Sequence, residues 1–193
     1  MDFDVSDFTA NISKKGLASA NKFEVRVFIP LTNGNTTTEP LSAGVVHRHK
    51  ELELMCDTAT IAGKTIQTSP EIQYGLRREV AYGAPTFDAL TLTFYCSEEL
   101  EILDRWQELM VKTVGPNRTG GSFDVGYYDT YAGSSQIEVT KLSTSGEAVF
   151  KYQYLEVYPK TVSALELSHG TSSGPMKISA IFNYTYWKDI TTP

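Results

Sequence analysis

The sequence predicts a mainly β protein, an antiparallel sandwich or part-barrel with one packed α-helix. Three observations lead to this fold class. Apolar and polar residues alternate in several short segments, which is the period of a half-buried strand. Asn, Gly and Pro residues typical of turns separate these segments. Only residues 97–114 carry apolar residues at the spacing of three and four that marks one face of a helix.

Six strands are expected. In chain order they cover residues 23–29, 49–56, 90–96, 136–142, 149–158 and 176–187. The first is typical, because Phe23, Val25 and Val27 alternate with charged residues. In the fifth, Phe150, Tyr152 and Tyr154 should share one face.

The single helix is expected to begin with Ser97 as its N-cap. Glu98 and Glu99 would then lie in the first turn, where acidic side chains complement the helix dipole. Gly115-Pro116 should end it. We expect one buried face, consisting of Leu100, Leu103, Trp106, Met110 and Val114.

Composition excludes several classes of protein. The 193 residues carry a formal net charge of −6, which disfavours tight binding of nucleic acid. With 41% hydrophobic residues, the bulk of the chain is not expected to be disordered. No stretch approaches the roughly 20 apolar residues of a membrane-spanning helix, so we expect no membrane protein. Cys56 and Cys96 lie in apolar alternating runs, and the acidic start of the chain does not resemble a signal peptide, so we expect buried thiols in a reducing compartment.

The chain shows no convincing catalytic, cofactor or metal motif. The segment Ala62–Thr65 is similar to the end of a phosphate-binding loop, but Thr58 stands where the first glycine belongs and no helix follows. His47 and His49 should be two exposed histidines on one strand face, and the third histidine, His169, is distant. We therefore expect a protein that is not an enzyme and has no cofactor.

Two parts of the chain are expected to differ from a compact domain. Residues 1–20 should form an N-terminal arm that is ordered only when something holds it, and residues 21–193 a single β domain. Within that domain, residues 63–85 are an extended excursion with few core residues, which suggests a partner. Arg77-Arg78 is compatible with an inter-subunit strand, a solvated loop or, least well, a nucleic-acid contact.

The order of these elements resembles the tail-tube proteins of contractile-tailed bacteriophages of the T-even type. The similarity covers roughly residues 20–114 and 148–187. The segments that carry it are residues 20–27, 52–59, 77–80, 86–93, the helix with Trp106 after Asp104-Arg105, residues 155–162 and residues 183–187.

The resemblance implies an assembly function. Subunits of that family form hexameric rings whose sheets join into a β-barrel around a lumen, and the rings stack into a tube. It implies that residues 63–85 are an inter-subunit arm, with contacts expected from Tyr74, Leu76, Arg77, Arg78, Glu79 and Tyr82. The expected partners are copies of the chain, the tail sheath, the baseplate and the tape-measure protein. DNA would pass through the lumen without specific binding during genome ejection, in a virion tail assembled in the host cytoplasm.

Two alternatives remain open. Extra loops at residues 31–49 and 115–135 would suit sheath contacts, or a baseplate protein of the same fold that initiates the tube. A different class is a β-sandwich that binds a small ligand such as a carbohydrate through Tyr127, Tyr128 and Tyr131.

Overall fold

The computed structural model describes residues 20–30, 47–73, 75–116, 122–165, 167, 169–170 and 174–191. The side chains of His47, Ile72, Gln73 and Leu76 are outside that description. Three predicted features therefore lie wholly or largely outside the described residues: the N-terminal arm, the insertion at 31–49 and Tyr74.

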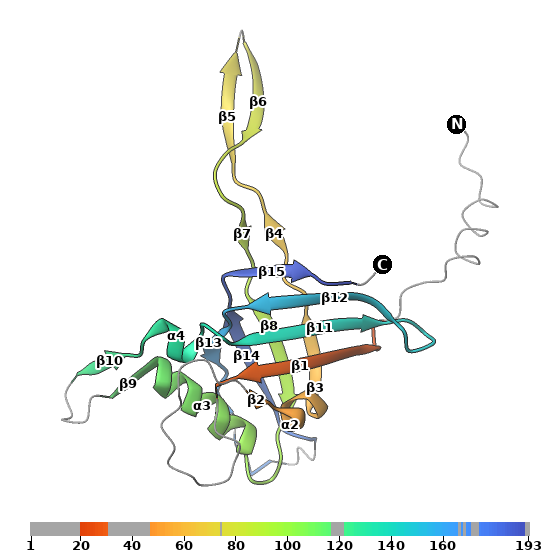
Figure 1. The fold of residues 1–193 in the computed structure, drawn as a ribbon, viewed down its shortest axis with the longest axis vertical. Coiled ribbons are helices and arrows are strands. Elements are labelled where there is room, and N and C mark those ends of the chain that lie inside the picture. Colours follow the sequence, from red (N-terminus) through yellow and green to blue (C-terminus); the bar gives the residue numbers. More distant parts are fainter. Residues whose placement is uncertain are drawn as a thin grey trace.

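Two antiparallel sheets form the body of the protein (Figure 1). The five-stranded sheet has the order β15 (Tyr186–Asp189), β12 (Ala148–Leu155), β11 (Gln136–Leu142), β1 (Phe23–Ile29), β2 (His47–Arg48). The four-stranded sheet has the order β13 (Tyr158–Val162), β14 (Lys177–Asn183), β8 (Leu90–Tyr95), β3 (Cys56–Thr60). Their strands cross steeply, as in an orthogonal sandwich (Figure 1). The prediction of a mainly β, antiparallel fold is confirmed.

The core lies between the two sheets and follows the alternation of the sequence. The buried side chains of β1 are Val25, Val27 and Ile29, and those of β8 are Leu90, Leu92 and Phe94. Tyr154 of β12 is also fully buried, and its hydroxyl accepts the backbone N–H of Ala62 at 3.3 Å. Alternate residues of each strand face outward, so both sheets also present an outer face.

Helix α3 (Glu101–Thr113) closes one end of the core. Trp106 is fully buried, with ring centroids 5.5 Å from Phe94 and 4.9 Å from Phe182, so its prediction as a core residue is confirmed. The predicted start at Ser97 was wrong: the N-cap is Leu100, in the left-handed conformation with φ 53°. The buried positions are Ile102, Trp106 and Leu109, so the buried face is rotated from the expected one.

The expected strand over residues 49–56 was also wrong. Residues Lys50–Leu54 form the short helix α2, and the strand begins only at Cys56. The alternation of Leu52 and Leu54 misled the prediction, because one turn of helix buries Leu52 and leaves Leu54 exposed.

Each of the last two expected strands is in fact two strands that belong to different sheets. Residues 149–158 divide at Glu156, whose φ of 56° turns the chain from β12 into β13. Residues 176–187 divide between β14 and β15. These corners connect the two layers of the sandwich.

The remaining elements project from the sandwich (Figure 1). They are the ribbon of β4 (Lys64–Thr65) and β7 (Thr86–Phe87), the hairpin of β5 (Thr68–Gln73) and β6 (Leu76–Ala81), the ribbon of β9 (Val114–Pro116) and β10 (Phe123–Val125), and the short helix α4 (Tyr128–Tyr131). None of the helices in the described residues has the length and apolar character needed to cross a membrane.

Candidate functional site

The hairpin β5–β6 stands clear of the sandwich on the β4–β7 ribbon (Figure 1). Its register runs from Thr68 opposite Ala81 to Gln73 opposite Leu76, with Gly75 at the tip in the left-handed region, φ 81°. Its ion pair is internal, because Arg78 Nη2 lies 2.8 Å from Glu71 Oε2. Thr68 Oγ1 donates to Glu79 Oε2 at 3.2 Å. The hairpin thus holds its shape through its own contacts.

The structure places most of the predicted subunit contacts on this hairpin. Arg77, Arg78 and Glu79 are exposed on β6, and Tyr82, just beyond it, is 58% exposed. The side chain of Leu76, like Tyr74, is outside the description. Whether these residues touch another subunit stays a prediction.

The outer face of the four-stranded sheet is rich in hydroxyl groups. Thr58 lies opposite Thr93, which lies opposite Ser179, and Thr93 Oγ1 and Ser179 Oγ are 3.0 Å apart. The next row contains Thr60, Thr91, Ile181 and Thr161. The four strands contain only three charged residues, Asp57, Lys160 and Lys177. This face is therefore polar and nearly uncharged.

Two of those charges neutralise each other. Asp57 is the extra residue of a bulge in β3, and Lys177 Nζ lies 2.7 Å from its Oδ2. Lys177 Nζ also lies 4.7 Å from the centroid of Tyr95, its cross-strand neighbour on β8. The hydrogen bond from Lys177, and then that from Tyr95, lowers the pKa of Asp57. The hydrogen bond to Asp57 likewise raises the pKa of Lys177, so both groups are charged at neutral pH.

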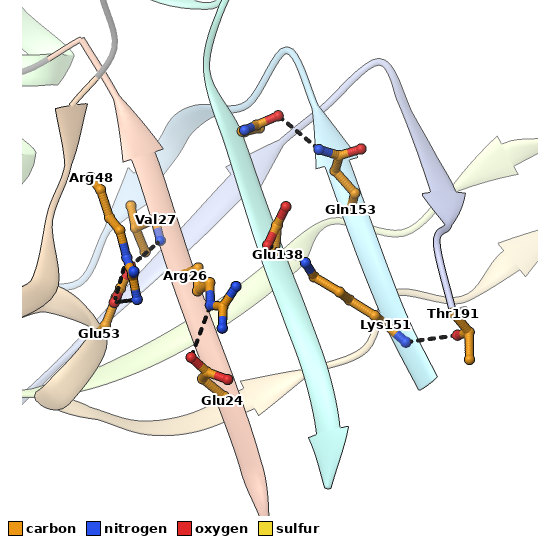
Figure 2. A network of polar contacts seen from close by, with 10 residues as sticks. Glu24, Arg26, Val27, Arg48, Glu53, Glu138, Lys151, Gln153 and Thr191 are labelled. Atoms are coloured by element: carbon orange, nitrogen blue, oxygen red, sulfur yellow. Dashed lines mark hydrogen bonds and ion pairs between the residues drawn. The ribbon is translucent and has the colours of Figure 1, made fainter. Parts of the chain in front are cut away.

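The outer face of the five-stranded sheet is different, because it carries a network of paired charges (Figure 2). Glu138 Oε2 lies 2.7 Å from Lys151 Nζ on the neighbouring strand. Arg26 Nε lies 2.9 Å from Glu24 Oε1 on the same strand. These four charged side chains are thus paired within the subunit.

One edge of the five-stranded sheet is blocked. Glu53 of α2 accepts the backbone N–H of Val27 at 3.3 Å, and Arg48 holds the same carboxylate at 2.8 Å (Figure 2). The backbone N–H of His49 donates to the backbone oxygen of Val27 at 3.1 Å. A side chain and a turn therefore occupy the positions that a further strand needs.

Open apolar grooves lie beside both edges of the four-stranded sheet. Beside β3, a groove of about 810 Å³ is lined by residues that include Phe23, Ala59, Ile61 and Phe150. Next to the end of β13, between α3 and the residues that follow the strand, a groove of about 490 Å³ is lined by residues that include Leu103, Met110, Leu165 and Leu167. Ile61 is 41% exposed and Leu167 82% exposed, so each groove has an unburied apolar side chain at its rim.

The histidines and cysteines differ from expectation. His49 is buried rather than exposed, with Nε2 3.4 Å from Ile29 O and Nδ1 3.3 Å from Arg105 Nη1, because it lies at the start of α2 under the sandwich. Cys56 and Cys96 are free but only partly buried. Burial, and to a smaller extent Asp57, raises the pKa of Cys56 to about 12. Among the described residues, no group of His, Cys, Asp and Glu side chains is arranged to hold a metal ion.

The three tyrosines considered for ligand binding do not form one flat platform. Tyr128 and Tyr131 meet edge to face at 5.6 Å, and Tyr131 meets Tyr158 in the same way. The Tyr128 hydroxyl donates to Glu156 Oε2 at 2.8 Å. Tyr127 is exposed. The cluster contacts the corner at Glu156, and its rings do not form a flat stacking surface for a ligand.

Comparison with known families indicates whether these surfaces belong to an enzyme or to an assembly. A family model described as phage tail tube protein matches residues 18–189. The chain belongs to this family. It is a structural component of a phage tail, and the family points to a role without catalysis.

Solved structures of contractile injection systems share the tail tube fold. A chain of the anti-feeding prophage baseplate aligns with a TM-score of 0.60 and 9% identity, over 91% of this chain and 97% of that one. A chain of the cap that terminates the anti-feeding prophage tube gives 0.58 and 10%, over 100% and 97%. The sheath/tube terminator of an extracellular contractile injection system gives 0.57 and 10%, over 91% and 97%. No curated protein sequence matches this tail tube protein.

Proposed function

We propose that copies of this tail tube protein join through their four-stranded sheets into a closed ring, with the hydroxyl-rich face lining a lumen through which DNA passes. Six copies per ring is the number implied by the resemblance to T-even-type tubes. Membership of the tail tube family is the observation that carries this proposal. The structure supports it through the edges and faces of the two sheets.

The number of strands distinguishes the two sheets. With four antiparallel strands, β3 and β13 run in opposite directions, so rotation about a ring axis brings β13 of one copy antiparallel to β3 of the next. With five strands, β15 and β2 run in the same direction, so the same rotation would require a parallel joint. The four-stranded sheet therefore continues without interruption, and closure removes its edges.

The surroundings of the edges favour the same sheet. Glu53 and His49 block one edge of the five-stranded sheet. Beside β3 and β13, in contrast, the two apolar grooves remain unfilled in a single subunit. We propose that pairing of β13 with β3 brings the groove with Leu167 against the groove with Ile61, which buries both rims.

The hairpin β5–β6 is proposed as the contact between stacked rings. It extends beyond the sandwich, carries the exposed residue Arg77 and is followed by the exposed residue Tyr82. The charged outer face of the five-stranded sheet would then point away from the lumen, toward the tail sheath. Association with the baseplate and the tape-measure protein, genome ejection, and assembly in the host cytoplasm belong to the same proposal.

A second candidate is a ring that begins or ends the tube. The three structures compared above are parts of a baseplate, a tube-terminating cap and a sheath/tube terminator. A chain of this kind would form single rings that do not stack by themselves.

Negative-stain electron microscopy over a concentration series tests the proposal. Wild-type protein should form rings and hollow tubes, whereas single rings at every concentration would favour the second candidate. Ile61→Asp and Leu167→Asp should fold normally, because both side chains are exposed in the subunit, but should remain monomeric. A monomeric wild type at all concentrations would contradict both candidates.

Val149→Asp provides the matched control. Val149 is 54% exposed, and it lies on β12 of the five-stranded sheet, two residues before Lys151. The proposal expects this variant to form rings like the wild type. Loss of rings in Val149→Asp but not in Ile61→Asp would place the joint on the five-stranded sheet and contradict the proposal.

A further inference from the structure

The outer face of the four-stranded sheet contains one cation away from the edges, Lys177 of β14. The other lysine of these strands, Lys160, lies in the edge strand β13 at a register shift. Strands of the five-stranded sheet, in comparison, contain Glu24, Arg26, Arg48, Glu138, Lys141, Lys151, Lys188 and Asp189. Lys177, at the start of β14, is therefore the one lysine on the two inner strands of this sheet.

The ammonium group of Lys177 has two partners on neighbouring parts of the sheet. Lys177 Nζ donates to Oδ2 of Asp57 on β3 at 2.7 Å. The same ammonium group lies 4.7 Å from the ring centroid of Tyr95 on β8. The bulge makes this possible, since the shift between Cys56 and Thr58 brings Asp57 and Thr58 onto the same outer face. Residues of two other strands, β3 and β8, thus hold this lysine of β14.

We infer that Asp57 neutralises Lys177 so that the wall of the lumen does not bind the phosphates of passing DNA. The inference rests on the proposed function, because it requires this face to line the lumen. A ring of unpaired lysines would release counterions from DNA and bind it, with an affinity that falls steeply as salt increases. Hydroxyl groups and the closed ion pair of Asp57 and Lys177 provide no such contact, which leaves Lys160 of β13 as the remaining lysine of these strands.

The test uses assembled tubes and a short dye-labelled DNA duplex. Asp57→Asn leaves Lys177 without its carboxylate, and these tubes should retain about tenfold more nuclease-protected duplex at low salt than wild-type tubes. The excess should disappear at high salt. The double variant Asp57→Asn/Lys177→Gln should return to the wild-type level, because it has neither charge.

Two further variants separate a charge on the hydroxyl-rich face from a charge elsewhere on the subunit. Glu24→Gln makes the same change of charge and frees Arg26 on the other sheet, so any DNA it binds should remain accessible to nuclease. Thr60→Lys adds an unpaired lysine to the hydroxyl-rich face and should retain protected DNA even if Asp57→Asn does not assemble.

The outcomes separate the inference from the proposed function. Tubes of Asp57→Asn and Thr60→Lys that retain no more protected duplex than wild type would overturn the inference and leave the tube intact. Retention by Thr60→Lys but not by a well-assembled Asp57→Asn would show that Asp57 has no neutralising role, and would overturn it too. Wild-type protein that forms neither rings nor tubes would overturn both.

Discussion

Glu53 on α2 and Val27 on β1 are joined by a hydrogen bond of 3.3 Å from a backbone N–H to a side-chain carboxylate. The glutamate takes the place of a neighbouring strand, and Arg48 fixes it there. The five-stranded sheet is therefore closed at this edge within the subunit, while both edges of the four-stranded sheet, β3 and β13, have no further strand beside them in the described structure.

Glu53→Ala should destabilise the subunit by about 1.5–3 kcal/mol, because a hydrogen bond to a nearly buried charged group is lost and Val27 N–H is left unpaired. The exposed edge of β1 should also promote aggregation. Urea unfolding and light scattering measure the two effects. Glu51→Ala, which removes an exposed partner of Arg105 from the same helix, should cost less than about 1 kcal/mol. Equal effects of the two variants would contradict the role of Glu53 at the edge.

Trp106→Ala should reduce the free energy of unfolding by about 3–5 kcal/mol, because it leaves a cavity between Phe94 and Phe182. Trp106→Phe should cost under about 2 kcal/mol, since it keeps one aromatic ring and removes an indole N–H that has no hydrogen-bond partner in the described structure. Urea denaturation followed by circular dichroism gives both values. A phenylalanine variant as unstable as the alanine variant would show that shape, rather than volume, determines the packing.

Replacement of residues 67–82 by a short Gly-Ser linker should leave single rings and abolish tubes. The subunit should keep its stability to within about 1 kcal/mol, because β5 and β6 contribute no residue to the core cluster of the described structure. Electron microscopy and thermal unfolding give the two readouts. Tubes of normal length from this variant would exclude the hairpin as the stacking contact.

Cys56 should make the stability of the protein depend on pH in the alkaline range. Its thiol has a pKa near 9 when unfolded and about 12 when folded, so the folded state retains a proton that the unfolded state loses. This contribution is fully present below pH 9 and is lost as the pH rises toward 12, by up to about 1.4 kcal/mol per pH unit. The difference in unfolding free energy between wild type and Cys56→Ala should therefore decrease above pH 9. A difference that stays constant from pH 8 to 10 would contradict the raised pKa.

The sequence predicts strands well where alternation is long and one face is buried, as in β1 and β8. It fails at α2, because five residues are too few to distinguish a helical turn from a strand by period alone. The corner at Glu156 was also missed, since a glutamate with positive φ has no sequence signal comparable to glycine. The pairing of Asp57 with Lys177 depends on a bulge and on contacts 120 residues apart, which no local pattern encodes.

The even number of strands in the four-stranded sheet has a consequence for the size of the ring. In the ring proposed above, each added subunit would contribute β3, β8, β14 and β13 in alternating directions, so five, six or seven copies would all give an unbroken antiparallel barrel. Hydrogen bonding between strands would therefore not determine the number of subunits in the ring. In the proposed ring, the angle at which the two apolar grooves meet would set this number, so we expect larger or smaller side chains at Ile61 and Leu167 to change the diameter of the channel.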